Sequence, residues 1–586
     1  MPNIRWLGLA CVLGLGGLSA WAQPTGPMVC TTTTPPPPQV RTEGVAERIG
    51  DLILNCSGGT PTPAGQTVPQ VNLQVYYNAD VTNRLLAPSG FTDALLIVDE
   101  AGSTTNPNRL VCGTPFTGVC AITGTGTGAG VYNGSSGRPN VFQAKDNGLN
   151  SLQWIGVPID PPGSTGIRTL RMANVRLHAH QKGPVTNPAQ MLTGVVSAVG
   201  PTAPPIANPS AVLGFISNGM EFATGAAPSF KQCAPQNPAL SQSPNQNGTP
   251  QVHLTFTEGF AQAYKPMTIA PYANANTSPV PVPQTVPGTQ WNSESGYYDP
   301  FLMPIPGRGD LGLAGLADHG TRLLARFTGV PKFVKLFAPA VITNGQLVAR
   351  MINVPASGAG NFVPKSANGF GLAQIAVNNA GDATVVYEVL RADPLAVETV
   401  AVPVYVAYAT PIPSPATVLV SGAFGPLTNV FTADANAPLP RFAELSTPVT
   451  AFTIGACIAG GINGNASVPN ASMQVNLACD VAAVPQSLTV NWPGNSFTLG
   501  TVNAATCSND PLISPAPPPS VYDTLVGSGS GKWNGFPGAT ATWKFQDAGE
   551  PGVNKDPVQL VIKNSFGITV LTVNGKLTGG NLQAHN

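Results

Sequence analysis

Three acidic residues near the end of the sequence have the types and spacing of a cation site. Asp547, Glu550 and Asp556 follow one another across a short segment rich in glycine and proline. Hard cations such as Ca²⁺ bind carboxylate oxygens that converge from a tight loop of this kind. The spacing differs from that of an EF-hand loop, and acidic residues beside Gly and Pro are also common in β-turns. The sequence therefore predicts a calcium site as one interpretation and, as the favoured one, a solvated turn between two strands.

A pair of histidines, His178 and His180, forms a second candidate metal site. Residues two apart on a strand lie on the same face, so both rings have the geometry to share a zinc ion. No third ligand is close in the sequence, however, and Arg176 occupies the same face and repels a cation. We therefore interpret the pair as polar residues of an edge strand.

Residues 307–312, Gly-Arg-Gly-Asp-Leu-Gly, match the pattern of dinucleotide-binding loops. Pro304 and Pro306 precede them and are incompatible with the central parallel strand that such a loop requires. The sequence beyond residue 22 has no Gly-x-Ser-x-Gly, His-Glu-x-x-His or Walker-type motif. A catalytic pair of carboxylates, as in glycosidases, remains an alternative, because the two residues need not be neighbours in sequence. The aromatic residues that could stack on sugars are Trp154, Trp291, Trp533 and Trp543. For most of them, packing in a core is the favoured role.

Eight cysteines follow Cys11, and an even number in an exported protein favours disulfides. None has the Cys-x-x-Cys spacing of a zinc ribbon or a redox site. Eight cysteines allow many pairings. Local closure suggests the pairs Cys30–Cys56 and Cys112–Cys120. For the other four cysteines, one option is Cys479–Cys507 with Cys233–Cys457.

The first 22 residues have the layout of a secretory signal peptide. Arg5 precedes an apolar run over residues 6–18, and small residues at Ala20 and Ala22 mark a cleavage site after Ala22. The run is too short to span a bilayer. The sequence therefore predicts a protein that is secreted or displayed at the cell surface.

The composition is poor in charge. Only 9% of the 586 residues are charged, against about 25% in an average protein, and the 27 basic and 27 acidic residues give a net charge of zero. This balance provides no basic face for nucleic acid. No apolar run after residue 22 is long enough for a transmembrane helix. Little charge repulsion keeps such a surface away from neighbours, matrix or cell wall.

The elements that would position these residues are mostly strands. Residues 71–77 alternate apolar and polar side chains, which is typical of a half-buried strand, and residues 317–327 predict one short helix. With 65 Gly and 61 Pro between such runs, the sequence predicts an all-β fold of several antiparallel, Ig-like β-sandwich domains in tandem, with long loops and very little helix. The expected divisions are a signal peptide at 1–22, a β-sandwich at 23–228, a central β domain with the helix at 229–440, a small Cys-containing β domain at 441–515 and a β module at 516–586.

Scattered motifs resemble a group of large exported β-rich proteins of Acidobacteria-type soil bacteria. The closing Gly-Asn-Leu-Gln-Ala-His resembles the end of a short β module shared by other exported bacterial proteins. The resemblance implies export and a β-rich architecture, and it carries no activity or catalytic residues. The segments that carry it are 43–51, 55–59, 81–86, 293–297, 315–318, 547–552 and 580–585.

These observations favour an exported structural, surface-associated or adhesive protein without catalytic activity. Its expected partners are other copies of itself, cell-surface or matrix components and polysaccharide, with no nucleic acid and no cofactor other than calcium. The alternatives are an extracellular carbohydrate-binding or carbohydrate-degrading protein and a subunit of an extracellular filament. Two facing carboxylates in a cleft beside an exposed Trp would favour the carbohydrate enzyme.

Overall fold

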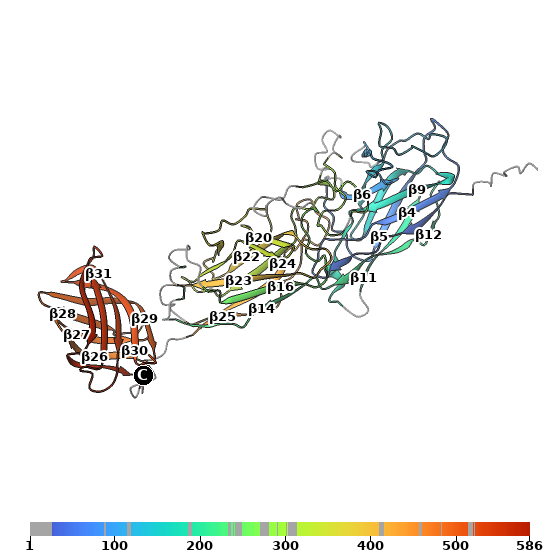
Figure 1. Cartoon of the computed structure of the whole chain (residues 1–586). Coiled ribbons are helices and arrows are strands. Elements are labelled where there is room, and N and C mark those ends of the chain that lie inside the picture. Colours follow the sequence, from blue (N-terminus) through green and yellow to red (C-terminus); the bar gives the residue numbers. More distant parts are fainter. Residues whose placement is uncertain are drawn as a thin grey trace, which may run out of the picture.

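The computed structural model confirms an all-β protein with several sheets. Three β units follow one another along the molecule, from the blue N-terminal unit to the red C-terminal unit (Figure 1). The structure describes residues 26–86, 90–113, 119–185, 190–232, 236–237, 240, 249–269, 281–289, 291–300, 302, 313–408, 415–455, 460–481, 483–513, 520 and 522–585. The predicted signal peptide, Cys233, Cys457 and residues 307–312 lie outside this set.

The N-terminal unit is one eleven-stranded sheet, ordered β12-β1-β4-β9-β6-β7-β8-β5-β11-β13-β2, beside the short pair β10-β3. Apolar side chains that alternate along its strands meet in a single core, in which Trp154 is fully buried. The elements are β1 (Val29–Thr33), β2 (Gln39–Arg41), β3 (Glu47–Arg48), β4 (Leu52–Gly58), β5 (Gln70–Tyr77), β6 (Phe91–Val98), β7 (Val141–Asp146), β8 (Ser151–Pro158), β9 (Gly163–Ala173), β10 (Arg176–Leu177), the 3₁₀ helix η1 (Ala179–Lys182), β11 (Met191–Val199), β12 (Ile206–Ala207) and β13 (Ser210–Ser217).

The central unit is a sandwich of two sheets, ordered β14-β16-β23-β18-β21 and β15-β25-β24-β17-β22-β20-β19. Inward side chains of both sheets share one core, as in other sandwiches. Its strands are β14 (Met220–Thr224), β15 (Ser229–Lys231), β16 (Val252–Glu258), β17 (Arg322–Thr328), β18 (Lys335–Pro339), β19 (Val341–Asn344), β20 (Leu347–Met351), β21 (Leu372–Ile375), β22 (Ala383–Arg391), β23 (Thr399–Ala407), β24 (Ala416–Gly425) and β25 (Val449–Gly455).

The helix predicted at 317–327 is wrong, because this segment contains the central strand β17. Leu323, Ala325 and Phe327 all enter the core between the sheets, a spacing of two that only a strand produces. Hydrogen bonding to β22 on one side and β24 on the other fixes this register. The prediction failed because Leu323, Leu324 and Phe327 also fit one face of a helix.

The C-terminal unit is one antiparallel sheet, ordered β33-β32-β31-β30-β29-β28-β27-β26-β34, around its own core. Its strands are β26 (Gly461–Val468), β27 (Ala471–Ala478), β28 (Ser487–Trp492), β29 (Asn495–Ser508), β30 (Thr524–Trp533), β31 (Phe536–Gln546), β32 (Pro557–Lys563), β33 (Thr569–Lys576) and β34 (Gly579–His585).

Three predicted divisions therefore move. The boundary at 515 falls inside the C-terminal sheet, since β29 and β30 pair along their whole length and β34 returns to pair with β26. Residues 441–455 belong to the central unit, because β25 pairs with β24. The central unit also starts before 229, at β14, which pairs with β16. Among the described residues, no helix is long and apolar enough to cross a membrane.

A buried ionic cluster joins the N-terminal and central units. Arg41 of β2 is 1% exposed and binds the carboxylates of Glu47 and Glu294, while its guanidinium lies 4.7 Å from the ring centre of Phe442. The hydroxyl of Thr321 donates to Glu294 at 2.7 Å. Because these groups come from both units and exclude water, the two units are held as one body.

Candidate functional site

Two of the three predicted calcium ligands, Asp547 and Asp556, form a clasp for the last strand. The two carboxylate oxygens of Asp556 accept the backbone N–H groups of Ala548 at 2.9 Å and Leu582 at 3.0 Å. Those of Asp547 accept the N–H groups of Gly549 at 3.1 Å and Ala584 at 2.9 Å. All four oxygens are thus occupied by backbone donors, two of them from β34.

Glu550 does not join this clasp as a ligand. Its carboxylate is exposed and accepts a hydrogen bond from the Asn581 amide at 3.0 Å. Within the described ranges, no group of three or more His, Cys, Asp or Glu side chains is placed to hold a metal ion. The carboxylates of Asp547 and Asp556 are buried, whereas Glu550, Asn554 and Lys555 of the same turn between β31 and β32 are exposed. The calcium interpretation of Asp547, Glu550 and Asp556 stays a prediction.

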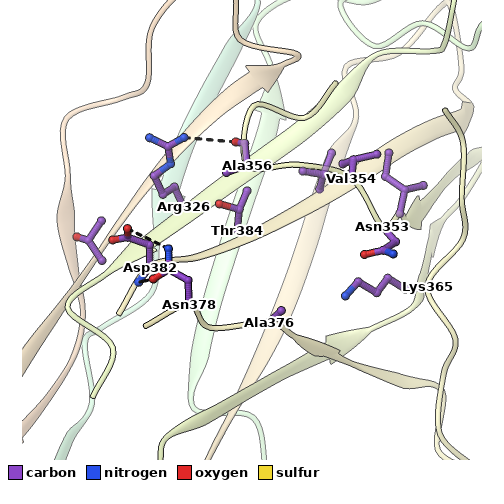
Figure 2. Close-up of a pocket in the computed structure, with 12 residues that line it drawn as sticks. Arg326, Asn353, Val354, Ala356, Lys365, Ala376, Asn378, Asp382 and Thr384 are labelled. Carbon is purple, nitrogen blue, oxygen red and sulfur yellow. Dashed lines mark hydrogen bonds between the residues drawn. The ribbon is translucent and has the colours of Figure 1, made fainter. Parts of the chain in front are cut away.

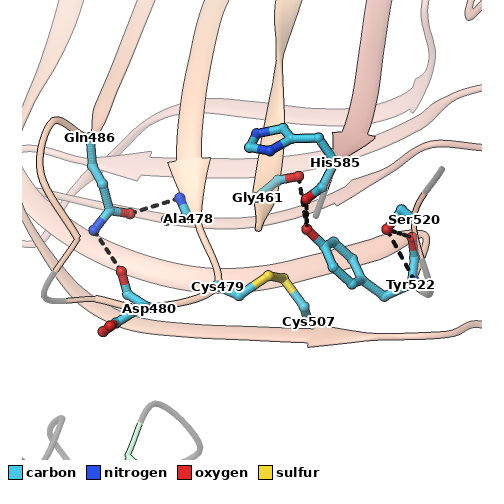
Figure 3. Close-up of a disulfide and its surroundings, with 9 residues drawn as sticks. All are labelled: Gly461, Ala478, Cys479, Asp480, Gln486, Cys507, Ser520, Tyr522 and His585. Carbon is cyan, nitrogen blue, oxygen red and sulfur yellow. Dashed lines mark hydrogen bonds between the residues drawn. A yellow bond between two sulfur atoms is a disulfide. The ribbon is translucent and has the colours of Figure 1, made fainter. Parts of the chain in front are cut away.

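The disulfides follow the predicted pairing wherever both cysteines are described. The bonds are Cys30–Cys56, Cys112–Cys120 and Cys479–Cys507. Figure 3 shows the last of these, which ties the end of β27 to the end of β29 across a sequence separation of 28 residues. Beside it, the Tyr522 hydroxyl reaches the carbonyl oxygens of Gly461 and His585 and so fastens the first and last strands of the unit.

The two histidines are not neighbours on a strand. His178 precedes η1 and its ring stacks on Phe431 with centroids 5.1 Å apart, whereas the His180 ring lies 3.3 Å from the Glu444 carboxylate. Burial lowers the pKa of His178. The strand β10 ends at Leu177 and the 3₁₀ helix η1 begins at Ala179, so the prediction that both histidines lie on one strand is wrong.

The strongest candidate site is a groove on the outer face of the central unit's seven-stranded sheet, lined by both polar and apolar side chains. Its floor consists of Arg326 and Thr328 from β17 and Thr384 and Val386 from β22. These side chains point outward because their neighbours along each strand enter the core. The hollow measures about 430 Å³.

Two loops form the walls of this groove (Figure 2). Residues 352–356 and Lys365 lie on one side, and residues 376–378 with Asp382 lie on the other. The Asn378 side-chain carbonyl accepts the N–H groups of Ala380 and Asp382, both at 2.9 Å, which holds the second wall in a tight turn. The Lys365 ammonium donates to the backbone carbonyl of Gln374 at 3.5 Å.

Two arginines of β17 hold the first wall in place. Arg322 is fully buried, pairs with Glu388 of β22 at 2.9 Å and donates to the Gly358 carbonyl at 2.6 Å. Arg326, four residues further, donates to the Ala356 carbonyl at 3.3 Å. The outer face thus changes along β17 from a covered ion pair to an open, cationic groove.

The carboxylates in the central unit determine which acid–base chemistry the groove could support. Among its described lining residues, Asp382 is the one carboxylate, whereas glycoside hydrolysis uses two that face each other. A close pair of acids does exist at Glu258 and Glu398, but the Glu258 carboxylate is used by backbone N–H groups of Tyr264 and Glu398, at 2.6 and 2.8 Å. Burial raises the pKa of Glu258 to about 7.

The predicted sugar-stacking tryptophans do not mark this site. Trp154 and Trp543 are buried in the cores of their units, and Trp291 and Trp533 are half-buried. The ring of Trp291 is covered by the Arg48 guanidinium at 4.3 Å. The groove was missed because its floor lies on the segment taken for a helix. The outward arginines at 322 and 326, alternating with apolar residues, were the available signal.

No protein-family model and no curated protein matches the sequence. Solved structures that resemble it include the C-terminal domain of the Streptococcus agalactiae AgI/II polypeptide BspA, at 7% identity over 73% of this chain and 99% of that chain, with a TM-score of 0.24. The C-terminal domain of the Streptococcus pyogenes antigen I/II-family protein AspA matches at 7% identity over 72% and 99%, with a TM-score of 0.24. The B domain of a biofilm associated protein matches at 8% over 72% and 85%, with a TM-score of 0.14. At these scores the function of the chain has to be inferred from its own residues.

Proposed function

We propose that this chain is an exported, surface-associated adhesive protein without catalytic activity, which binds its ligand in the groove of the central unit. The observation that carries the proposal is the groove itself, an open polar surface on a rigid sheet with a single carboxylate, Asp382, among its described lining residues. A lone acid without a facing partner binds and orients a ligand but does not supply both acid and base.

The architecture supports this role. The buried Arg41–Glu294 contact holds the N-terminal and central units together, so a load applied at one unit is transmitted to the other. Disulfides staple the N-terminal and C-terminal units, as is common in proteins that work outside the cytoplasm. An elongated, crosslinked molecule suits the presentation of a binding site at a distance from a surface.

The hydrogen-bonding side chains of the groove favour a carbohydrate ligand over a protein partner, with Ile352, Val354 and Val386 completing the lining. Amides and hydroxyls line it at Asn353, Asn378, Thr328 and Thr384, and these are the groups that exchange hydrogen bonds with sugar hydroxyls. Protein interfaces, in contrast, rest on buried aromatic and aliphatic anchors.

The test fills the groove and leaves the rest of the molecule unchanged. Beads coated with the purified full chain are assayed for retention on immobilised extracellular polysaccharides. The variant Thr384→Trp places a large ring on the floor of the groove and is expected to abolish retention. Thr498→Trp, at an exposed strand position in the C-terminal unit, is the matched control. Equal retention of both variants, with unchanged thermal unfolding, would refute the groove as the binding site.

A further inference from the structure

We infer that the groove continues into a second hollow and that the two together bind an acidic polysaccharide, a chain of sugar rings that carry carboxylate or sulfate groups. This inference rests on the proposed function and adds the chemical class of the ligand. It depends on the continuity of the two hollows, on the charges along them and on one exposed aromatic ring.

The second hollow adjoins the groove at Asn378, which lines both. It measures about 570 Å³ and lies between residues 330–335 on one side and Gln374 with residues 377–379 and Gly381 on the other. The two hollows share a wall, the turn from Val377 to Asp382, so an extended ligand passes over Asn378 from one to the other. A single sugar would occupy only one of them.

Cations dominate the walls of this combined site. Arg326 and Lys365 line the groove, Lys332 and Lys335 line the second hollow, and Asp382 is the one carboxylate among the described lining residues. Such a local excess is unusual in a chain with equal numbers of basic and acidic residues and only 9% charge.

Within the described part of the chain, Arg326 and Lys365 donate to the backbone carbonyls of Ala356 and Gln374, and neither side chain forms an ion pair with a carboxylate. An anionic polymer crossing the site would supply the missing counter-charge, and its attraction would weaken with added salt.

Phe333 supplies the stacking surface. Its side chain is 56% exposed, although an aromatic ring of this size is normally covered. Its backbone has φ of 77°, in the left-handed region that bulky residues rarely adopt. Such conformations persist where the surrounding structure enforces them and they gather at binding sites. The Lys332 ammonium lies over the ring, 5.5 Å from its centre, so this aromatic surface already carries a cation that an acidic group of the ligand would meet.

Nucleic acid is the other acidic polymer, and the observations favour polysaccharide over it. Single-stranded nucleic acid is bound by a series of aromatic platforms along a basic channel. Among the described lining residues of this site, Phe333 is the one exposed ring, and the other polar groups include the amides of Asn353, Gln374 and Asn379. Amides and a single platform suit hydroxyl-rich rings.

The experiment measures affinity of the purified full chain for three soluble probes by titration calorimetry. The probes are polygalacturonate, neutral dextran and a poly-dT oligonucleotide, at low and high salt. We expect polygalacturonate to bind more tightly than both others, with an affinity that falls at high salt. The variant Phe333→Ala and the double variant Arg326→Gln/Lys365→Gln are each expected to lose at least tenfold in affinity.

The controls are Phe566→Ala and Lys563→Gln, which remove an exposed ring and an exposed cation from the C-terminal unit and should change nothing. Equal binding of dextran and polygalacturonate, abolished by Thr384→Trp, would overturn the acidic ligand while the groove remains the binding site. Tighter binding of the oligonucleotide would overturn the ligand class. If Thr384→Trp changes the binding of none of the three probes and of no immobilised polysaccharide, the proposed function fails as well.

Discussion

Arg41 donates hydrogen bonds to both carboxylate oxygens of Glu294, although the two residues are 253 positions apart in sequence. The Arg41 Nη1 atom lies 2.8 Å from one oxygen and its Nη2 atom lies 3.1 Å from the other, and both side chains are almost fully buried. Since Arg41 belongs to the N-terminal sheet and Glu294 lies against the central unit beside Thr321, this pair helps to couple the two units. The Arg84–Asp318 ion pair is another contact between them.

The first prediction concerns this pair. The variant Glu294→Gln leaves the Arg41 charge buried with Glu47 as its remaining carboxylate partner, and breaking a buried pair in this way costs about 3–5 kcal/mol. We expect calorimetry to show a lower unfolding temperature for the joined N-terminal and central units. The control is Lys544→Gln, which removes a partly exposed ion pair with Asp510 and should leave the transition where it is. An unchanged transition in Glu294→Gln would contradict the role of the pair.

The second prediction is a pH dependence at Glu258. Burial raises the pKa of this carboxyl to about 7 in the folded protein, above the ordinary value of about 4.3 in an unfolded chain. The folded state therefore holds the proton more tightly, so the stability from this group is complete below about pH 4.3 and is lost as the pH rises to 7. The variant Glu258→Gln cannot titrate. We expect the melting temperature of the wild type relative to this variant to be highest at pH 5 and to decline by pH 8. A difference that stays constant would show that Glu258 does not titrate in this range.

The sequence predicted much of the fold because strand patterns and cysteine spacing are local signals. The alternation at 71–77 lies in β5, and the pairs Cys30–Cys56 and Cys112–Cys120 form as local closure suggested. The unit boundaries were not local signals, because β29 pairs with β30 across the division predicted at 515. Composition marks where a chain lacks regular structure, and it does not mark whether the strands on either side pair.

The candidate site was beyond reach for a related reason. The groove combines β17 and β22 with two loops, so its lining residues are spread from 326 to 386 with no motif spacing. Arg322 and Glu388 pair across neighbouring strands, and only the register of those strands brings them together. Conversely, Asp547 and Asp556 had the composition of a metal loop, but the return of β34 supplied backbone donors for their oxygens.

The third prediction concerns the Cys479–Cys507 disulfide. It closes a segment of 28 residues that includes β28 and most of β29, and a loop of this length is stabilised by about 3 kcal/mol when crosslinked. The double variant Cys479→Ser/Cys507→Ser should lower the urea concentration at which half of the C-terminal unit is unfolded. The fluorescence of the buried Trp543 reports this unfolding. Reduction of the wild-type protein should produce the same shift and should not add to that of the variant. A midpoint that resists both treatments would show that the strand pairing alone sets the stability of this unit.

The last prediction separates a clasp from a calcium site at Asp556. The variant Asp556→Ala leaves the N–H groups of Ala548 and Leu582 without their acceptor, and each buried donor left unpaired costs about 1–3 kcal/mol. The C-terminal unit should therefore unfold at a lower urea concentration, whereas Glu550→Ala, which removes an exposed carboxylate from the same turn, should have little effect. Because backbone donors already hold the carboxylates of Asp547 and Asp556 and Glu550 binds Asn581, we expect neither added Ca²⁺ nor a chelator to move the wild-type midpoint. A rise with Ca²⁺ that disappears in Asp556→Ala would show instead that the turn binds the ion.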